Sequence, residues 1–304
     1  MAVPSQCPLC GEKREHQNVV TPHVYGGKKG QAFYRCATCD VSYLFPGLSP
    51  EEEGQFYAAE FSAFMTSRAG TSAGWEQPER HVKANESTVA RRMKYLRPRL
   101  PRTGRILEVG CSSGFMLYPL REEGYECVGV EPSGVFGDYV RSRGIKCFDS
   151  FNGLRTHPDY GKWFDVIMHY FVLEHVSDPQ VFLKEQVDLL KEHGRLVFEI
   201  PNSADALLTI YAVPEFERFY WMVAHHWYFS EKSLGYLLSQ FDLQYEILLD
   251  QRYDLSNHMV WARDGTPGGM GRFTDKLGVE IENQYRQALI RSRYCDTLIG
   301  VIKK

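Results

Sequence analysis

The sequence predicts an α/β protein in which a parallel sheet is covered by helices on both faces and is preceded by a small cysteine-rich domain. Three observations support this prediction. Apolar segments alternate with helical ones from Gly104 onward, a glycine-rich loop follows the first apolar segment, and two C-x-x-C pairs lie near the N-terminus. The expected boundaries are 1–46 for the cysteine-rich domain, 47–103 for a helical linker and 104–304 for the α/β domain, with insertions at 204–229 and 254–294.

Length, composition and charge exclude several classes of protein. A chain of 304 residues, 43% of them hydrophobic, can form one large domain and one small one. A net charge of −3 gives no sign of a nucleic-acid partner. No apolar run approaches the roughly 20 residues of a membrane span, and the first ten residues lack the apolar core of a signal peptide. We therefore expect a cytoplasmic protein without a nucleic-acid or membrane partner.

Four of the eight cysteines form two C-x-x-C pairs, with a short strand pattern at Gln31–Arg35 between them. Two such turns can present four thiolates to one ion, which is how structural zinc is bound without an open coordination position. A redox dithiol is the alternative, and the presence of a second pair argues against it. The predicted zinc ligands are Cys7, Cys10, Cys36 and Cys39, and the other cysteines, Cys111, Cys127, Cys147 and Cys295, are assigned to packing.

The linker is expected to contain two helices and a loop. Ser49 and Pro50, followed by three glutamates, indicate a helix start, because serine caps, proline fits the first turn and acids favour the positive helix end. Residues 67–77 are rich in Gly, Ser and Thr and predict a loop, and residues 81–100 have the period of an amphipathic helix. In the α/β domain, the patterns predict strands at 105–109, 126–130, 244–249 and 296–302, and helices at 114–121, 230–239 and 274–291.

The glycine-rich loop, within the stretch ILEVGCSSG at 106–114, fits two chemistries. It matches G-x-S-x-G, in which Ser112 would be the nucleophile of a serine hydrolase. It also matches a turn that closes over a cofactor, and Glu131 follows at the tip of the next strand, where a carboxylate can accept both ribose hydroxyls. Because a hydrolase elbow normally follows several strands, the cofactor interpretation is favoured. A noncatalytic cofactor-binding module is the third possibility.

The segment Glu108–Gly114 resembles the first motif of class I S-adenosylmethionine-dependent methyltransferases, in which serine sometimes replaces the middle glycine. Three later segments resemble that family in the same order: Phe164–His169 its fourth strand, Tyr170–Pro179 the following turn, and Gly194–Asn202 its fifth strand. The resemblance implies an α/β, Rossmann-like, seven-stranded methyltransferase sheet with helices on both faces, in which the last strand inserts antiparallel between the fifth and sixth. It also implies S-adenosylmethionine as the cofactor.

The resemblance also implies which residues bind S-adenosylmethionine. The first motif would line the methionine and ribose, Glu131 would hold the ribose, and residues after the second and third strands would lie beside the adenine. The end of the fourth strand would face the methyl group. The expected residues are Glu108, Gly110, Cys111, Ser112, Gly114, Glu131, Pro132, Ser133, Asp149, Ser150, His169 and Tyr170.

The cysteine pairs are followed by Tyr43–Pro46 and by a helix that starts with Ser-Pro-Glu-Glu. Together these segments resemble the zinc-ribbon extension of bacterial methyltransferases associated with sugar nucleotides and cell-surface polysaccharide. That group includes deoxysugar C-methyltransferases, which are longer than this chain. The resemblance therefore implies methyl transfer to an oxygen or nitrogen of a sugar or nucleotide-sugar in polysaccharide biosynthesis, with sugar C-methylation as the alternative.

Two later segments are candidates for binding the acceptor. Residues 204–222 look helical and aromatic and precede Ala224–Ser230, so they form either a lid or a buried aromatic cluster. In the second insertion, an amide, an imidazole and an indole lie close together, a combination suited to sugar hydroxyls. Its glycine run at 265–271 predicts a flexible turn, and the histidine is alternatively a structural one. The candidate substrate-binding residues are Tyr228, Asn257, His258 and Trp261.

Transfer of a methyl group to a hydroxyl requires a base, and histidine suits this role near neutral pH. We expect His225 first, His175 second and His226 third. In ubiquinone-pathway O-methyltransferases the matching segment reads E-x-x-E-H and binds a divalent metal. Here Phe171 replaces the first acid, so no catalytic metal is expected, and Glu174 either orients His175 or belongs to a structural helix start.

Overall fold

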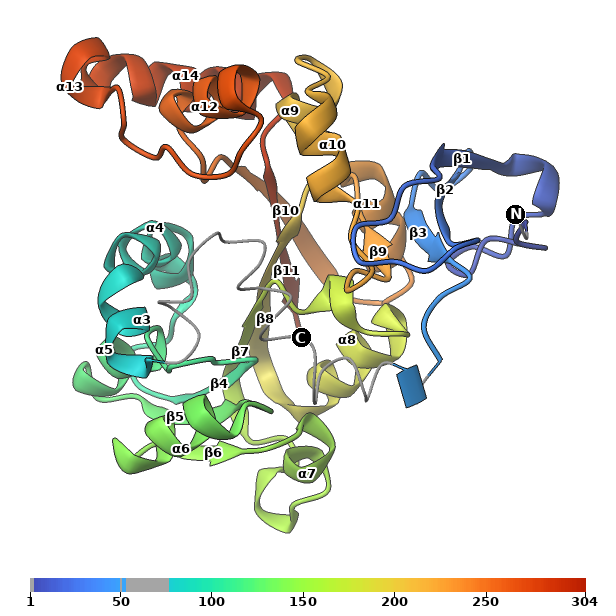
Figure 1. The fold of residues 1–304 in the computed structure, drawn as a ribbon. Helices are drawn as coiled ribbons and strands as arrows, with labels where there is room; N and C mark the ends of the chain where they lie inside the picture. The colour runs from blue at the N-terminus through green and yellow to red at the C-terminus, as the bar shows by residue number, and fades with distance from the viewer. Residues whose placement is uncertain (1–2, 50, 53–76) are drawn as a thin grey trace.

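One seven-stranded sheet forms the centre of the protein (Figure 1). The computed structural model describes residues 3–49, 51–52 and 77–304. The strand order is β10-β11-β8-β7-β4-β5-β6. The strands are β4 (Arg105–Val109), β5 (Glu126–Val130), β6 (Lys146–Phe148), β7 (Phe164–Tyr170), β8 (Leu190–Pro201), β10 (Gln244–Asp250) and β11 (Thr297–Lys303). Strands β4 to β8 are parallel, and β11 pairs antiparallel with both β8 and β10. The predicted fold class, including the inserted last strand, is confirmed.

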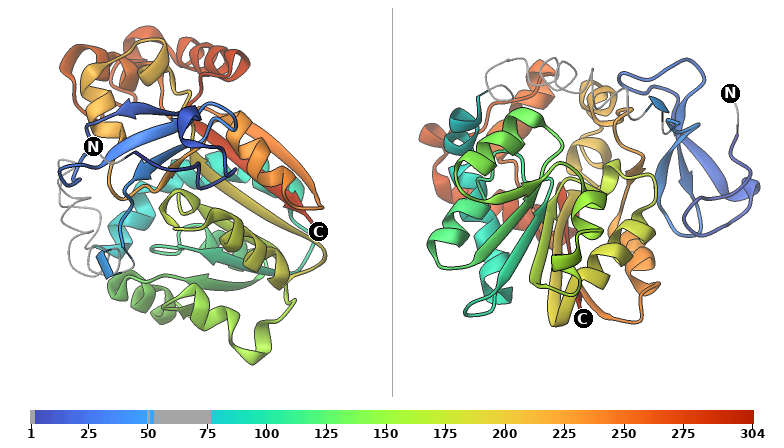
Figure 2. Two further views of the ribbon diagram at one scale, coloured as in Figure 1. Left: turned by 90° about the vertical axis from the view of Figure 1, so that its right-hand side faces the viewer. Right: turned by 90° about the horizontal axis from the view of Figure 1, so that it is seen from below.

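Helices cover both faces of this sheet (Figure 2). On one face α4 and α5 pack with Ile106 and Met168 in one apolar cluster, and α6 closes the end beside β6. On the other face Leu183 of α8 and Leu237 of α11 pack with Leu107. These helices are α3 (Pro78–Ala84), α4 (Glu86–Leu96), α5 (Leu117–Glu122), α6 (Gly134–Ser142), α7 (Phe151–Arg155), α8 (Pro179–Leu189) and α11 (Glu231–Ser239). Three-residue 3-10 helices are η1 (Arg14–His16), η3 (Arg97–Arg99), η4 (Pro158–Tyr160) and η5 (Leu173–His175).

Local capping explains where several helices begin. Ser230 and Ser233 form a capping box at the start of α11, and Asp178 accepts a hydrogen bond from Val181 N before α8, whose first residue is Pro179. The helix predicted at 81–100 is divided at Asn85 into α3 and α4 and ends in η3. The helix predicted from Gly114 begins only at Leu117. The hydroxyl of Ser49 accepts from Glu52 N at 3.2 Å, as a helix start requires, but the rest of that predicted helix and most of the predicted loop at 67–77 lie outside the described residues.

The cysteine-rich domain contributes a second, four-stranded sheet in the order β1-β2-β3-β9. Its strands are β1 (Gln17–Thr21), β2 (Ala32–Cys36), β3 (Ser42–Phe45) and β9 (Trp227–Tyr228). Strand β9 comes from the region predicted as an acceptor lid, so the ribbon, residues 3–46, shares a sheet with a segment of the α/β domain. Figure 2 shows the ribbon, in blue, beside one end of the main sheet.

The two predicted insertions are helical, with shorter elements than expected. The first contains α9 (Ala206–Thr209) and α10 (Pro214–Tyr220), and the second contains α12 (Leu255–Asp264), α13 (Thr274–Leu277) and α14 (Val279–Ser292). The single helix predicted at 274–291 is interrupted because Gly278 has a φ of 86°, outside the helical region. In the part of the chain that the structure describes, no helix is both long and apolar enough to cross a bilayer.

Candidate active site

The glycine loop, Gly110–Gly114, connects β4 to α5 at the carboxyl edge of the sheet. Gly110 and Gly114 have φ values of 72° and 76°, and Ser112 also has a positive φ of 48°. A Cβ atom on Gly110 would lie 2.7 Å from the side chain of Val172, which follows β7. Gly110 therefore permits both the turn and the close approach of the segment that follows β7.

Glu131 joins the tip of β5 to the glycine loop. Its Oε2 accepts a hydrogen bond from Ser112 N at 2.7 Å, and its Oε1 accepts one from Ser133 N at 2.9 Å. Burial raises the pKa of Glu131, and the two N–H donors oppose that rise. The carboxylate is thus fixed at the edge where the resemblance places a ribose.

The other expected adenine-side residues lie along the same edge. Pro132 is exposed, and the hydroxyl of Ser133 caps α6. Asp149 is exposed and pairs with Arg141 at 2.8 Å, while Ser150 caps α7 by accepting from Gly153 N at 3.1 Å. These four residues thus follow the carboxyl ends of β5 and β6, on the same edge as Glu131.

On the α4 side of the sheet, Glu108 and Tyr170 lie near Arg92. The Arg92 guanidinium lies over the Tyr170 ring at 3.8 Å. Glu108 is 2% exposed, its Oε2 has no hydrogen-bond partner among the described residues, and burial raises its pKa well above the usual value. A buried acceptor of this kind can accept a hydrogen bond from a ligand amine or hydroxyl.

His169 and Tyr170 lie on opposite faces of β7. Neighbouring strand residues point to opposite faces, so His169 faces α8 whereas Tyr170 faces α4. The His169 ring is fully buried, stacks on Phe198 at 4.9 Å and contacts Phe182 at 5.4 Å. Burial lowers its pKa to about 3. The structure therefore separates His169 from Tyr170, which the resemblance places together beside the methyl group.

A serine hydrolase needs a base that is hydrogen-bonded to its nucleophile, and no described residue fills this role for Ser112. The Ser112 hydroxyl has no hydrogen-bond partner among the described residues. The nearby imidazole of His81 in α3 instead bonds Ser113 Oγ at 2.8 Å. Cys111 is buried, and its sulfur lies 3.9 Å from Cys147. The geometry of the glycine loop thus favours ligand binding over nucleophilic attack by Ser112.

Three polar side chains converge beyond the end of β7, and we call them the histidine cluster: Glu174, His175 and His225. One ligand atom of each lies within 4.8 Å of those of the others. The His175 and His225 rings are 4.6 Å apart, centroid to centroid. Because a carbonyl oxygen only accepts, His175 Nδ1 carries a proton and donates it to Ala224 O in a hydrogen bond of 2.8 Å.

Glu174 is the buried acid of this cluster. It is 1% exposed, and neither carboxyl oxygen has a hydrogen-bond partner among the described residues. Burial raises its pKa to about 8. His226, the third expected base, lies outside the cluster. A Cβ on Gly47, just after the ribbon, would be 3.8 Å from His226 Nδ1, so this ring lies toward the ribbon side.

The four candidate substrate residues are all buried and contact other parts of the protein, three through hydrogen bonds and Trp261 through ring packing. Tyr228 donates to Tyr220 O and accepts from Met222 N at 3.2 Å, with its ring 4.9 Å from His225. His258 Nδ1 bonds Tyr285 OH at 2.6 Å, and burial lowers its pKa to about 4. Asn257 Nδ2 donates to Gly268 O at 2.5 Å, and Trp261 packs on Phe216 and Phe219. For Asn257, His258 and Trp261 the alternative of structural residues inside the insertion accounts for these contacts.

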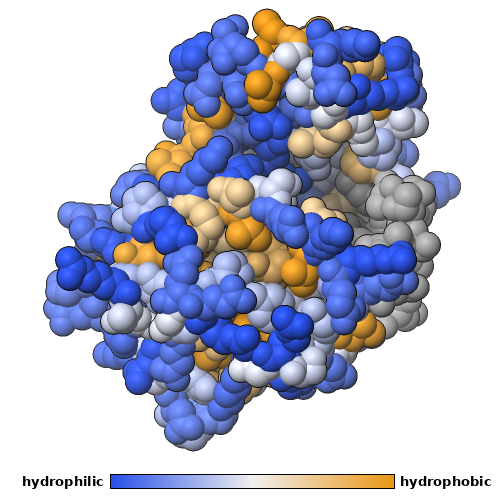
Figure 3. All heavy atoms as spheres, turned by 90° about the vertical axis from the view of Figure 1, so that its left-hand side faces the viewer, coloured by the Kyte–Doolittle hydropathy of each residue, from blue (hydrophilic) through white to orange (hydrophobic). Residues whose placement is uncertain are grey.

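Two polar residues at the same sheet edge were not expected from the sequence. Arg252 follows β10 and lies over the ring of Phe171 at 4.2 Å. Asp205 follows β8, is 3% exposed, and caps α9 through Leu207 N at 2.7 Å. Burial, with Asp296 nearby, raises the pKa of Asp205 to about 8. Their only sequence signal is a polar residue shortly after a strand. Figure 3 shows the adjoining surface, hollowed below the insertion helices at its top.

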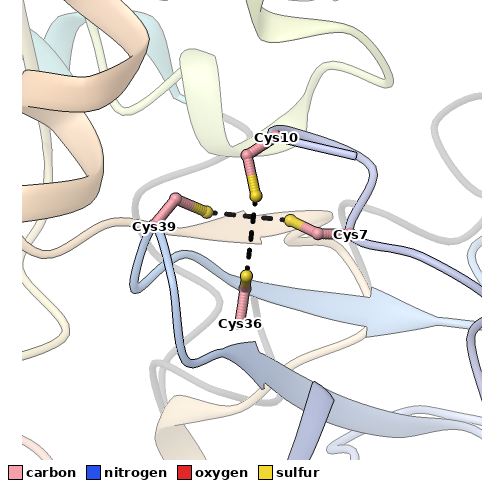
Figure 4. Close-up of side chains that lie close together, drawn as sticks. All are labelled: Cys7, Cys10, Cys36 and Cys39. Carbon is pink, nitrogen blue, oxygen red and sulfur yellow. Dashed lines mark hydrogen bonds between the residues drawn. The ribbon is translucent and has the colours of Figure 1, made fainter. Parts of the chain in front are cut away.

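The four ribbon cysteines point toward one common centre (Figure 4). Cys7 and Cys39 sulfurs are 3.7 Å apart, Cys10 and Cys36 sulfurs are 3.6 Å apart, and all four lie within 4.8 Å of one another. A tetrahedral zinc ion with Zn–S bonds of about 2.3 Å requires sulfur separations of about 3.8 Å. The donor set and its spacing therefore fit a structural zinc ion, which would leave no position open for a substrate.

Residues 80–247 match the family model described as "Methyltransferase domain", and the chain belongs to this family. Together with the fold and the glycine loop, the match identifies residues 80–247 as a methyltransferase domain of the class I, S-adenosylmethionine-dependent type.

Relatives named "Ubiquinone biosynthesis O-methyltransferase" include proteins from Azorhizobium caulinodans and Ruegeria sp. (strain TM1040). The first is 28% identical over 102 residues, which cover 32% of this chain and 40% of that protein. The second is 25% identical over 165 residues, which cover 52% and 66%. The chain thus spans less than half of the Azorhizobium protein.

Among solved structures, a SAM-dependent methyltransferase from Archaeoglobus fulgidus has a TM-score of 0.49 and 17% identity, covering 81% of this chain and 100% of that one. A possible histamine N-methyltransferase from Thermotoga maritima has a TM-score of 0.49 and 19% identity, covering 80% and 97%.

Proposed function

We propose that this enzyme methylates an oxygen or nitrogen of a small polar acceptor, and that the acceptor is a sugar or nucleotide-sugar. The observation that supports acceptor activation most directly is the histidine cluster beyond the end of β7. Val172 packs against Gly110, and Glu174 follows Val172 by two residues, so the cluster lies next to the glycine loop.

Bound S-adenosylmethionine supplies an electrophilic methyl group. The glycine loop and Glu131 would hold its methionine and ribose portions, and Glu108 and Tyr170 would face it from β4 and β7. The protein must then place the acceptor atom in line with the methyl group and remove its proton as the new bond forms.

His225 is the base that we propose, because it converges with a carboxylate and a second imidazole. Once His225 takes the acceptor proton, the carboxyl group of Glu174 would lie close enough to accept a hydrogen bond from the resulting imidazolium. His175 is held by Ala224 O and would orient the cluster through its Nε2. His226 would have a structural role beside Gly47.

The acceptor class rests on the resemblance of the ribbon to that of sugar-nucleotide methyltransferases and on the polar groups at this edge. The names of the curated relatives support a second candidate, an acceptor of ubiquinone biosynthesis. To decide, the full chain is incubated with methyl-labelled S-adenosylmethionine and either nucleotide-linked sugars or a simple catechol. Labelled sugar is expected, and the bond that carries the label separates oxygen, nitrogen and carbon acceptors. Labelled catechol alone would overturn the sugar proposal, and no calorimetric binding of S-adenosylmethionine or S-adenosylhomocysteine would overturn the function.

Replacing Glu131 by alanine is expected to weaken S-adenosylhomocysteine binding by at least about tenfold. The substitution removes a charged acceptor for ribose hydroxyls, and such hydrogen bonds contribute about 1.5–3 kcal/mol. Isothermal titration measures the loss. Asp138→Ala is the control, because Asp138 lies on α6 and, among the described residues, its side chain forms an exposed pair with Arg141 of the same helix. Parental affinity in Glu131→Ala would show that the ribose assignment is wrong.

The Glu174 carboxyl is expected to destabilise the folded protein increasingly as pH rises from 4.5 to about 8. Its pKa is raised from 4.5 to about 8, so in this window the folded protein binds more protons than the unfolded chain, and stability falls with rising pH. Glu174→Gln removes the titration, so its stability relative to the parent should rise by up to about 1.4 kcal/mol per pH unit. Urea unfolding at several pH values tests this. Asp188→Asn, which alters an exposed pair with Lys184, should show no such trend, and a pH-independent effect of Glu174→Gln would contradict the prediction.

A further inference from the structure

The segment 221–230, which carries His225, is bonded on one side to the ribbon. Tyr25 N donates to Trp221 O at 2.7 Å, and Val223 N donates to Tyr25 O at 3.0 Å. Farther along, Leu44 N donates to His226 O at 3.0 Å, and β9 pairs with β3 through Tyr43 and Trp227. The ribbon thus contacts the segment before and after His225.

The opposite side of the same segment is bonded to η5 and the residue after it. Ala224 O accepts from His175 Nδ1 at 2.8 Å, and His226 N donates to Glu174 O at 2.8 Å. Trp227 Nε1 donates to Val176 O at 2.9 Å. Segment 221–230 therefore lies between the ribbon and the acid and imidazole of the histidine cluster.

The metal-binding turn itself is connected to the end of this segment. Asp40, directly after Cys39, accepts a hydrogen bond from Ser230 Oγ. Cys36, Cys39 and Tyr43 belong to the same apolar cluster as Trp227 and Phe229. A change in the cysteine site would therefore be transmitted through both a hydrogen bond and a packed core.

The cofactor half of the site is built differently. Glu131 is held by Ser112 and Ser133, and His81 of α3 contacts Ser113. Among the described residues, no hydrogen bond joins the ribbon to residues 108–150. The ribbon thus contacts the acceptor half of the site and leaves the cofactor half to other elements.

We propose that the ribbon is a positioning element for acceptor activation: metal binding at its four cysteines fixes β3 and Asp40, which hold His225 against Glu174 and His175. The role given to His225 rests on the proposed function, whereas the mechanical coupling does not. Loss of the metal should release segment 221–230 and leave cofactor binding intact.

The test uses the full chain with its metal content measured. Asp40→Gly removes the bond to Ser230 without backbone strain, because Asp40 has a φ of 65°. Thr38→Ala is the matched control in the same turn, since among the described residues the Thr38 hydroxyl bonds to Glu12 of the ribbon alone. Amide hydrogen exchange at 222–229 should be at least about tenfold faster in Asp40→Gly and in parent protein whose metal has been removed with a chelator. It should be unchanged in Thr38→Ala.

Two further measurements separate positioning from general loss of structure. Nitrogen NMR should show His175 losing its fixed Nδ1–H tautomer in Asp40→Gly and in chelated protein, while S-adenosylhomocysteine affinity stays within about twofold. If Asp40→Gly does not fold, the chelated protein alone decides. Unchanged exchange at 222–229 after metal removal, or loss of cofactor affinity in parallel with faster exchange, would overturn the proposal. Faster exchange at 222–229 in a protein that methylates no acceptor would support the coupling and refute the proposed function.

Discussion

His225→Ala is expected to lower methyl-transfer turnover by about 100-fold or more while S-adenosylhomocysteine affinity stays near the parental value. A general base acts only as the acceptor loses its proton, so its removal raises the barrier for transfer and leaves the bound cofactor unaffected. Turnover with the acceptor found in the labelled-cofactor screen and calorimetric affinity are measured separately, because only their combination identifies a base.

His226→Ala is the matched control for this experiment. It removes a neighbouring imidazole from the same segment, but that ring lies beside Gly47 and outside the histidine cluster. Its turnover should remain within a few-fold of the parent. If both variants keep parental turnover, transfer proceeds by positioning alone. If His226→Ala is the more damaged variant, the order of the two histidines is wrong.

Glu199→Ala is expected to destabilise the protein by about 3–5 kcal/mol, because it leaves buried arginine charge without its partner. Glu199 has no exposed side-chain surface and accepts from Arg92 Nε at 3.0 Å, Arg91 Nη1 at 2.7 Å and Tyr95 OH at 2.5 Å. These bonds join β8 to α4, the helix that covers the Glu108 side of the cofactor edge. The free energy of unfolding in urea measures the loss.

Glu192→Ala is the control for Glu199→Ala, since Glu192 lies on the same strand and is exposed. Burial raises the pKa of Glu199, but Arg92 and Arg91 outweigh that effect and lower it to about 2. Its ionised form therefore contributes stability above pH 4.5, and this contribution is lost as pH falls toward 2. The difference between parent and Glu199→Ala should shrink in acid. An equally small effect of both substitutions at neutral pH would show that the network contributes little.

The sequence was most informative where the structural signal is local. Strands β4 and β5 begin and end at the predicted residues, because each is an apolar run bounded by turn residues. The four cysteines could likewise be grouped from their spacing. The capped start of α11 was recognisable because Ser230 acts within one helical turn.

Features set by distant contacts could not be predicted. Strand β9 has two residues, and nothing in Trp227 or Tyr228 indicates that β3 is their partner. The resemblance placed His169 and Tyr170 together, whereas alternation along β7 sends them to opposite faces. Nor did the sequence indicate that Tyr285, 27 residues after His258, forms a hydrogen bond with its imidazole.

Strand β9 is far from β3 in the sequence, so the ribbon sheet cannot be completed until most of the chain has been synthesised. Tyr43 leaves the ribosome long before Trp227, its pairing partner. At about 5–20 residues per second, β3 would keep an open edge for on the order of 10–40 s. An unpaired strand edge can join another chain, so the edge of β3 is open to such pairing until Trp227 has been synthesised. Pulse-labelled chains stalled before and after Trp227 should differ in protease resistance of the ribbon.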